Sequence, residues 1–295
     1  MRTLVAAWSI ALAGCGGGSS EAEQPMDEPL IDGVAQTPIA PDACANESAD
    51  AAEVRMAIAR VRALAGLPSL HCDVRASAAA RGHCDYVLAN GEMTHVQQKG
   101  HRKFTGELAA DRLRAASFED DLAGEVLANT AGAGVILAPY GFMNSVYHRA
   151  LFLRTETVSY GYAGGEGCAT IDFGRRARVR DDVTVVWPPP GSFNVPLAFY
   201  ASRETPNPTP GRDVVGSPIS LVRVRALPSV EATLVGPEGA LPATLLTHTN
   251  DPNRFVRVGE AHLIPLRALA PSTRYRAEFI VAGERIETSF TTAAR

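Results

Sequence analysis

The chain has 295 residues, of which 46% are hydrophobic and 20% are charged, with a formal net charge of −4. This is the composition of an ordinary globular protein, and the length suggests two domains. The near-balanced charge, without a basic block, argues against nucleic acid as a partner. No apolar run beyond the N-terminus approaches the roughly 18 residues that a transmembrane helix needs.

Residues 1–15 are predicted to be a targeting segment. Arg2 supplies a short basic part, and the apolar run Leu4–Ala13 is too short to span a bilayer. The run leads into Cys15 and a glycine-rich stretch, which resembles the lipobox of a bacterial lipoprotein signal. We therefore expect export and a membrane anchor made of lipid on Cys15; an ordinary secretory signal cut nearby is the alternative. Gly16 after the cysteine suggests, by the same resemblance, the outer membrane or the cell surface.

Residues 16–43 are rich in Gly, Ser, Glu and Pro. Such a composition cannot bury a hydrophobic core, so we expect a disordered tether that separates the folded part from the membrane.

Four cysteines remain besides Cys15, namely Cys44, Cys72, Cys84 and Cys168. An exported chain folds where disulfides persist, and their spacing does not resemble that of zinc ligands. Four cysteines allow three pairings, among which the sequence alone does not choose. We expect Cys44–Cys72, which would hold the entry segment, and Cys84–Cys168, which would tie the second helix to the following sheet. Free buried thiols are the alternative.

The next part of the chain predicts a mixture of helices and strands. Apolar spacing indicates helices over about 50–65, 73–89, 108–116 and 139–153, and strands over 158–162 and 169–173. The loop 91–106 carries His95, and the segment 118–129, which carries Glu125, fits neither pattern clearly. Because these elements do not alternate as βαβ units, we expect an α+β fold.

The pattern changes at about Asp181, where short apolar stretches are separated by Pro, Gly and Asn. Strands are predicted over 183–187, 195–200, 218–224, 231–235, 243–247, 262–266, 274–281 and 286–291. This spacing indicates an antiparallel β-sandwich over residues 181–295. The region has no cluster of His, Cys or acidic residues in sequence, so we assign it no chemistry.

Short motifs in a fixed order connect the first region to a known family. They are Arg62–Pro68 at the end of the first helix, Ala79–His83, His95, Gly124-Glu125, Ser145–Arg149 and Gly161-Tyr162. In this order they resemble a CAP domain (SCP-like; cysteine-rich secretory proteins, antigen 5 and pathogenesis-related proteins). The resemblance implies an α-β-α sandwich over residues 44–180. The C-terminal region resembles an Ig-like or fibronectin-III-like module.

The resemblance also implies that His95, Glu125 and His148 line one cavity, together with Ser145 and Tyr147. Two imidazoles and a carboxylate suit Zn²⁺ or another divalent cation, or proton transfer. One departure is that the interval 126–147 contains no Asp or Glu, whereas many relatives carry a second glutamate there. The absence of this second glutamate argues against any mechanism that needs paired carboxylates.

Two function classes follow. The first is a membrane-anchored extracytoplasmic protein that binds a small apolar ligand or a surface protein partner, with a metal as an option. The second is a metal-assisted hydrolase of peptides or envelope polymers. No nucleophile motif is present, since Ser145 lacks a G-x-S-x-G setting. We therefore favour binding over catalysis and name no catalytic residue.

Overall fold

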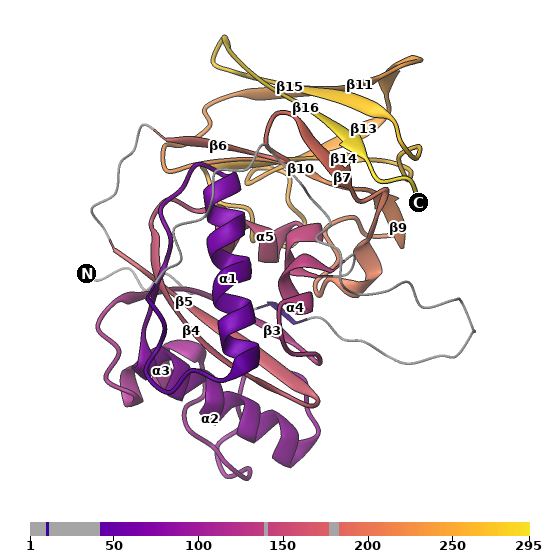
Figure 1. Ribbon diagram of the computed structural model, residues 1–295. Helices are drawn as coiled ribbons and strands as arrows, with labels where there is room; N and C mark the ends of the chain where they lie inside the picture. The colour runs from indigo at the N-terminus through magenta and orange to yellow at the C-terminus, as the bar shows by residue number, and fades with distance from the viewer. Residues whose placement is uncertain (1–9, 12–41, 139–140, 177–182) are drawn as a thin grey trace.

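The computed structural model describes residues 10–11, 42–138, 141–176 and 183–295. Its N-terminal part, up to residue 176, is built on one five-stranded sheet (Figure 1). The strand order is β1 (Ile10–Ala11), β3 (Asp121–Ala128), β5 (Cys168–Arg175), β4 (Thr157–Gly165) and β2 (His71–Cys72). The three central strands are antiparallel, while β1 and β2 each run parallel to their neighbour.

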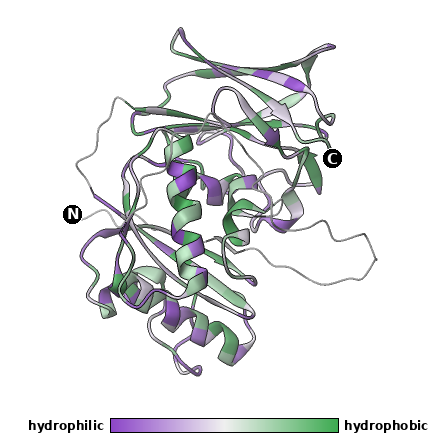
Figure 2. Cartoon of the chain, viewed as in Figure 1, coloured by the Kyte–Doolittle hydropathy of each residue, from purple (hydrophilic) through white to green (hydrophobic). Residues whose placement is uncertain are grey.

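Helices cover both faces of this sheet. Helix α1 (Ala49–Leu64) packs into a core cluster with Val126, Tyr160 and Ile171 of the strands, and that cluster also contains Leu151 and Phe152 of α5 (Tyr147–Leu153). Helix α2 (Val74–Asn90) and α3 (Ala109–Ala115) form separate clusters against the other face. Figure 2 shows polar and apolar residues alternating along α1, and the helix buries Val54, Ala57, Ile58 and Val61.

Local sequence explains where α2 begins and ends. The Asp73 carboxylate accepts hydrogen bonds from the backbone N–H groups of Arg75 and Ala76, which satisfies donors that the first turn leaves free. Gly91 follows the helix with φ 69°, a left-handed conformation that glycine adopts without steric cost. The predicted boundaries of this helix are therefore close to the observed ones.

The prediction of one long helix over 139–153 is wrong. The described part of this segment contains a 3₁₀ turn (η1, Phe142–Asn144) and then the short α5, while α4 (Gly134–Leu137) precedes it. Ser145 is extended, with φ −132° and ψ −180°, and its Oγ donates to the Phe142 carbonyl at 2.6 Å. This side-chain bond competes with helical pairing and separates the two turns.

Residues 184–295, here called the C-terminal module, form several mostly antiparallel sheets. The four-stranded sheet contains β13 (Ala243–Thr247), β14 (Glu260–Pro265), β10 (Ile219–Arg223) and β6 (Thr184–Trp187). The five-stranded sheet contains β12 (Gly239–Leu241), β11 (Val230–Gly236), β15 (Arg274–Val281), β16 (Glu284–Thr292) and β7 (Ser192–Val195). A small sheet pairs β8 (Ala198–Tyr200) with β9 (Val214–Gly216), and the 3₁₀ turn η2 (Ala201–Arg203) follows β8.

The core of the C-terminal module contains residues from both larger sheets, such as Leu221, Leu263, Phe279 and Phe290. A further cluster joins Val146 and Tyr147, at the start of α5, to module residues that include Phe199 and Ile264. Figure 1 shows the module lying over α5 and one end of α1. The two parts of the chain therefore share hydrophobic packing.

No helix in the described part of the chain combines the length and the hydrophobicity needed to cross a bilayer. Cys15 and residues 16–41 lie outside the described residues, as does the predicted domain boundary near residue 181.

Candidate functional site

Glu125 lies at the centre of a buried polar cluster next to α2. Its Oε1 is 2.7 Å from Nδ1 of His95, and its Oε2 is 2.5 Å from Nη2 of Arg112. Arg112, in α3, also donates through Nη1 to the His95 carbonyl oxygen at 3.1 Å. Both oxygens of Glu125 thus have a fixed partner, and Arg112 binds the carboxylate and the backbone of the loop that carries His95.

The cluster is almost closed to solvent. Glu125 and Arg112 are each 1% exposed, whereas His95 is 7% exposed. Burial opposes ionisation of Glu125, but the positive charge of Arg112 and the neighbouring His83 and His95 outweigh it, so the pKa of this carboxyl lies below its usual range. Among the described residues, Nε2 of His95 has no hydrogen-bond partner. His95 is thus the group through which this cluster approaches the surface.

Asp172 supplies a second carboxyl that sequence reasoning missed. It is the cross-strand partner of Glu125 in the β3–β5 ladder, it is 1% exposed, and neither of its oxygens has a partner that meets hydrogen-bond geometry among the described residues. Burial and the negative charge of Glu125 raise the pKa of Asp172 well above its usual value. The single guanidinium of Arg112 cannot balance two buried carboxylates, so Asp172 remains neutral while Glu125 is ionised.

A signal for Asp172 was present in the sequence. It stands between Ile171 and Phe173 in a predicted strand, and a charged residue within such an apolar run needs a partner. The missing information was strand register, because only the pairing of β3 with β5 places Asp172 opposite Glu125.

His83 belongs to the same cluster from the α2 side. Its Nε2 lies 3.8 Å from Oε1 of Glu125, and its Nδ1 lies 3.0 Å from the side-chain amide of Gln97. Burial lowers the pKa of His83 to about 4, against the opposing effect of Glu125. At neutral pH His83 is therefore a neutral, hydrogen-bonded core residue.

His148 has a different partner. Its Nδ1 lies 2.9 Å from Oε1 of Glu204 in the C-terminal module, and both side chains are fully buried. The Glu204 carboxylate also accepts hydrogen bonds from the backbone N–H groups of Val146, Tyr147 and His148, at 2.9, 2.8 and 3.2 Å. One module carboxylate thus holds both the imidazole and the first turn of α5. The ring of Phe142 stacks on His148 with a centroid distance of 5.0 Å.

The alternation of side chains along β3 explains why His148 does not meet Glu125. A Cβ added to Gly124 would lie 2.6 Å from a methyl carbon of Leu151, so position 124 faces α5. Successive strand residues point to opposite faces, and Glu125 accordingly faces α2 and α3. The structure brings His95 and Glu125 together, and it places His148 with Glu204 on the opposite face of the sheet.

This arrangement does not fit the predicted metal site. Zn²⁺ needs several side chains directed at one point, usually three or four protein ligands. The two oxygens of Glu125 are held by His95 and Arg112, and the donor atoms of His148 lie across the sheet. Within the described ranges, no group of three or more His, Cys, Asp or Glu residues is arranged to hold a metal ion.

Of Ser145 and Tyr147, both predicted to line the cavity, Tyr147 contacts the C-terminal module, and Ser145 bonds within its own turn. Ser145 is buried and bonded to the Phe142 carbonyl, as described above. The Tyr147 hydroxyl donates to Oδ1 of Asp251 at 2.6 Å and accepts from Asn253 at 2.9 Å. Burial and the bond to Asp251 raise the pKa of Tyr147. Tyr147 is therefore a buried contact between the two parts of the chain.

Two further ion pairs cross the same junction. Nε of Arg154 lies 2.6 Å from Oε1 of Glu260, and Nη1 of Arg257 lies 2.8 Å from Oε1 of Glu156. Arg149, fully buried, donates to the Pro218 carbonyl and to the Ser220 hydroxyl of the module. These contacts lie around α5, so the module covers this face of the N-terminal part.

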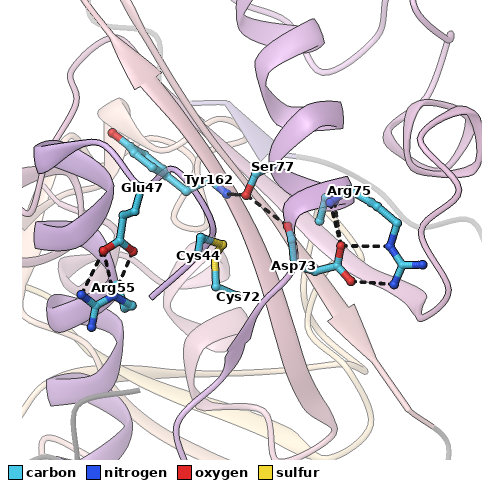
Figure 3. The surroundings of a disulfide bond; sticks show 9 residues. Cys44, Glu47, Arg55, Cys72, Asp73, Arg75, Ser77 and Tyr162 are labelled. Atoms are coloured by element: carbon cyan, nitrogen blue, oxygen red, sulfur yellow. Dashed lines mark hydrogen bonds and ion pairs between the residues drawn. A yellow bond between two sulfur atoms is a disulfide. The ribbon is translucent and has the colours of Figure 1, made fainter. Parts of the chain in front are cut away.

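Both expected disulfides are confirmed. Cys44 is bonded to Cys72, and Cys84 of α2 is bonded to Cys168 of β5. Figure 3 shows the first bond between two ion pairs, Glu47 with Arg55 and Asp73 with Arg75. The entry segment is thus fixed to the strand that precedes α2.

A cleft of about 360 Å³ opens beside the Cys44–Cys72 bond. Two tyrosines of β4 and small residues of α2 form much of its wall, namely Tyr160, Tyr162, Ser77 and Ala78. A second, mainly apolar pocket between α1 and the C-terminal module, lined by Leu64, Met143 and Trp187, has room for about 20 Å³ only. Of these two, the cleft beside the disulfide has space for a small ligand.

Comparison with known proteins identifies a CAP domain in this chain. Residues 56–173 match the model of the cysteine-rich secretory protein family, CAP, which covers less than half of the chain. The structure is also similar to that of an extracellular protein containing an SCP domain from Bacillus anthracis str. Ames, at a TM-score of 0.36 and 24% sequence identity. This similarity covers 42% of the present chain and 40% of the other. No curated protein matches the chain in sequence.

Proposed function

We propose that this protein, whose residues 56–173 form a CAP domain, is exported and works by binding a small apolar ligand. Two disulfides within the first 168 residues support export, because disulfides persist in oxidising compartments. The predicted lipid on Cys15 would anchor the protein to the outer membrane or the cell surface. The C-terminal module, which we take to be Ig-like, would hold the CAP domain from one side.

We favour binding over catalysis because Glu125 is buried and both of its carboxylate oxygens already have partners. A general base needs a free oxygen within reach of the proton that it abstracts. Glu125 is 1% exposed and both of its oxygens are occupied, one by His95 and the other by Arg112. This carboxylate stabilises the loop that carries His95 and does not face bulk solvent. A binding role therefore fits the geometry better than hydrolysis.

The ligand site that we propose is the cleft beside Cys44–Cys72. Its volume of about 360 Å³ lies within the range of small-molecule sites, roughly 300–1,000 Å³. Its lining combines apolar side chains, such as Val74 and Ala78, with polar ones, such as Ser77 and Glu47, and the Cys44–Cys72 bond is part of the wall. A preformed wall lowers the entropic cost of binding. A ligand with an apolar body and one polar end suits this mixture of surfaces.

A fluorescent fatty acid is a suitable probe of this cleft. Ala78 is an exposed residue of α2 that lines it, and Ala78→Trp would fill it without removing a core side chain. We expect Ala78→Trp to abolish probe binding, while the matched control Ala268→Trp, at an exposed position of the C-terminal module, binds as the wild type does. Equal binding by all three proteins would place the ligand elsewhere.

The hydrolase alternative has one specific observation in its favour. Asp172 provides the second carboxyl that the interval 126–147 lacks, and its neutral state beside an ionised Glu125 resembles an acid and base pair. The test is turnover of peptide and ester substrates by the wild type, Glu125→Gln and Asp172→Asn. Activity that disappears in both variants, at unchanged fold by circular dichroism, would establish the enzyme class.

A further inference from the structure

Residues 98–105 form an exposed loop, here called the basic loop. Hydrogen bonds join the two ends of this loop. The backbone N–H of Gln97 donates to the Glu107 carbonyl at 2.9 Å, and Oε1 of Gln97 accepts from the Thr105 N–H at 2.7 Å. Gln97 is fully buried, whereas every residue from 98 to 105 is exposed. A buried amide thus holds the base of a protruding loop, and compact loops of this kind are often functional.

The basic loop concentrates positive charge. It carries Lys99, Arg102 and Lys103 and no acidic residue, in a chain whose net charge is −4. Lys99 and Lys103 are also the only lysines in the whole sequence; every other permanent cation is arginine. In the described part of the chain, no ion pair involves these three side chains, although Asp85, Glu92 and Glu107 lie near the loop in sequence.

Exposed apolar side chains accompany this charge. Eleven large hydrophobic residues of the described chain are exposed, and four of them lie between positions 88 and 108: Leu88, Val96, Phe104 and Leu108. Phe104 stands inside the basic loop, directly after Lys103, and is 36% exposed. Single exposed hydrophobic residues are ordinary, but Phe104 stands among the cations of a protruding loop, and this combination of exposed aromatic and positive charge is what the loop offers a partner.

The surroundings leave this surface accessible. The basic loop packs on α2, since Thr105 lies against Gly82. Helix α2 covers the sheet face opposite α5, and it is α5 that the C-terminal module covers. The loop is also close in sequence to His95, the least buried member of the polar cluster. A partner can therefore reach the basic loop without displacing the module.

We propose that the basic loop docks on the anionic phospholipid surface of a membrane. Lys99, Arg102 and Lys103 would contact lipid phosphates, and Phe104 would enter the interface between head groups and acyl chains. Lipid surfaces attract clustered cations and accept aromatic side chains at this depth. An acidic polymer would match the charge but would leave Phe104 in water. The proposal depends on the export in the proposed function, but it needs neither a ligand in the cleft nor lipid on Cys15.

Because Lys99 and Lys103 are the two lysines of the sequence, chemical labelling of lysine side chains measures the accessibility of the basic loop. The full chain with Cys15→Ala, which cannot be lipidated, is mixed with vesicles of phosphatidylglycerol and phosphatidylcholine, or of phosphatidylcholine alone. An amine-reactive reagent then labels the protein, and mass spectrometry measures modification of Lys99 and Lys103. We expect the anionic vesicles to protect both lysines and the neutral vesicles to leave them reactive. Contact through the N-terminal apolar segment would not by itself protect them.

Substitutions measure the contributions of the three cations and of Phe104 to membrane binding separately. Each cation near an anionic membrane contributes about 1 kcal/mol, so Lys99→Ala, Arg102→Ala and Lys103→Ala together should weaken vesicle co-sedimentation roughly 100-fold. Phe104→Ala should weaken it about tenfold. The matched control combines Arg267→Ala, Arg274→Ala and Arg295→Ala, which removes three exposed cations of the C-terminal module and should change binding little.

Three results would overturn the proposal. The first is equal protection by neutral and anionic vesicles, and the second is an equal loss of binding in the control triple variant. The third is protection by soluble polyglutamate as strong as that by vesicles, without any effect of Phe104→Ala, which would identify an acidic polymer as the partner. None of these results depends on probe binding in the cleft, so the proposed function is judged separately.

Discussion

Oε1 of Glu204 and Nδ1 of His148 lie 2.9 Å apart, although one belongs to the C-terminal module and the other to the CAP domain. Both side chains are fully buried, and the same carboxylate holds three backbone N–H groups at the start of α5. Burial opposes the ionisation of Glu204, but the bond to His148 and these N–H groups keep the pKa of its carboxyl below the usual range.

Removal of this carboxylate should destabilise the protein strongly. Glu204→Ala leaves a buried imidazole and several backbone donors without their acceptor, and such losses cost about 3–5 kcal/mol. Urea unfolding followed by circular dichroism measures the change. The matched control is Glu238→Ala, which removes an exposed glutamate of the same module. A similar, small effect of both substitutions would show that Glu204 does not stabilise the junction.

Arg112 should stabilise the folded chain only while Glu125 is ionised. Arg112→Met leaves the buried Glu125 carboxylate next to Asp172 without its main countercharge, and we expect a loss of about 3–5 kcal/mol in the free energy of unfolding. The double variant Arg112→Met with Glu125→Gln removes both charges and should recover much of this loss. A double-mutant cycle measures the coupling. Additive effects of the two substitutions would contradict a direct interaction.

The neutral Asp172 should make stability fall as the pH rises. Burial and the charge of Glu125 raise the pKa of Asp172 in the folded chain above its ordinary value of 3.8. Its contribution to stability is therefore complete below about pH 4 and decreases as the pH rises toward the folded-state pKa, because only the unfolded chain releases the proton.

Asp172→Asn removes this dependence, since an amide does not ionise. Urea unfolding of the wild type and of Asp172→Asn between about pH 4 and pH 9 should show a smaller decline in the variant. Curves that stay parallel over this range would mean that Asp172 has the same protonation state in the folded and the unfolded chain.

The two disulfides should contribute unequally to the free energy of unfolding. Cys84–Cys168 spans 84 residues, and Cys44–Cys72 spans 28. In the chain-entropy model a longer loop gives more stabilisation, so the Cys84→Ala, Cys168→Ala pair should cost about 1 kcal/mol more than Cys44→Ala, Cys72→Ala. Equilibrium unfolding of the two double variants tests this order. The reverse order would indicate that native packing around the bonds outweighs the effect of loop length on the entropy of the unfolded chain.

The sequence predicted those features that depend on local pattern. Helices α1 and α2, the strands around Gly161 and Ile171 and most strands of the C-terminal module follow from periodicity and from turn residues. Both disulfides were also anticipated, although spacing alone left three pairings open. The helix over 139–153 failed because the helical spacing of its apolar residues did not reveal the bond from Ser145 to the Phe142 carbonyl.

The candidate site was predictable only in part. His95 and Glu125 do meet, but Arg112 and Asp172 were not foreseen, because their positions depend on strand register and on the packing of α3. Glu204 lies 56 residues after His148, in a region to which composition assigned no chemistry. Contacts between distant segments of this kind leave no periodic signal in a single sequence.

Glu204 also sets an order of events during synthesis and export. The chain emerges from its N-terminus, so all four bonded cysteines precede Glu204 by at least 36 residues. Both covalent links can therefore form while the start of α5 still lacks its acceptor. The segment from Val146 to Glu156 can therefore make its full set of contacts only after the C-terminal module has been synthesised, because its partners Glu204, Asp251, Arg257 and Glu260 all lie in that module.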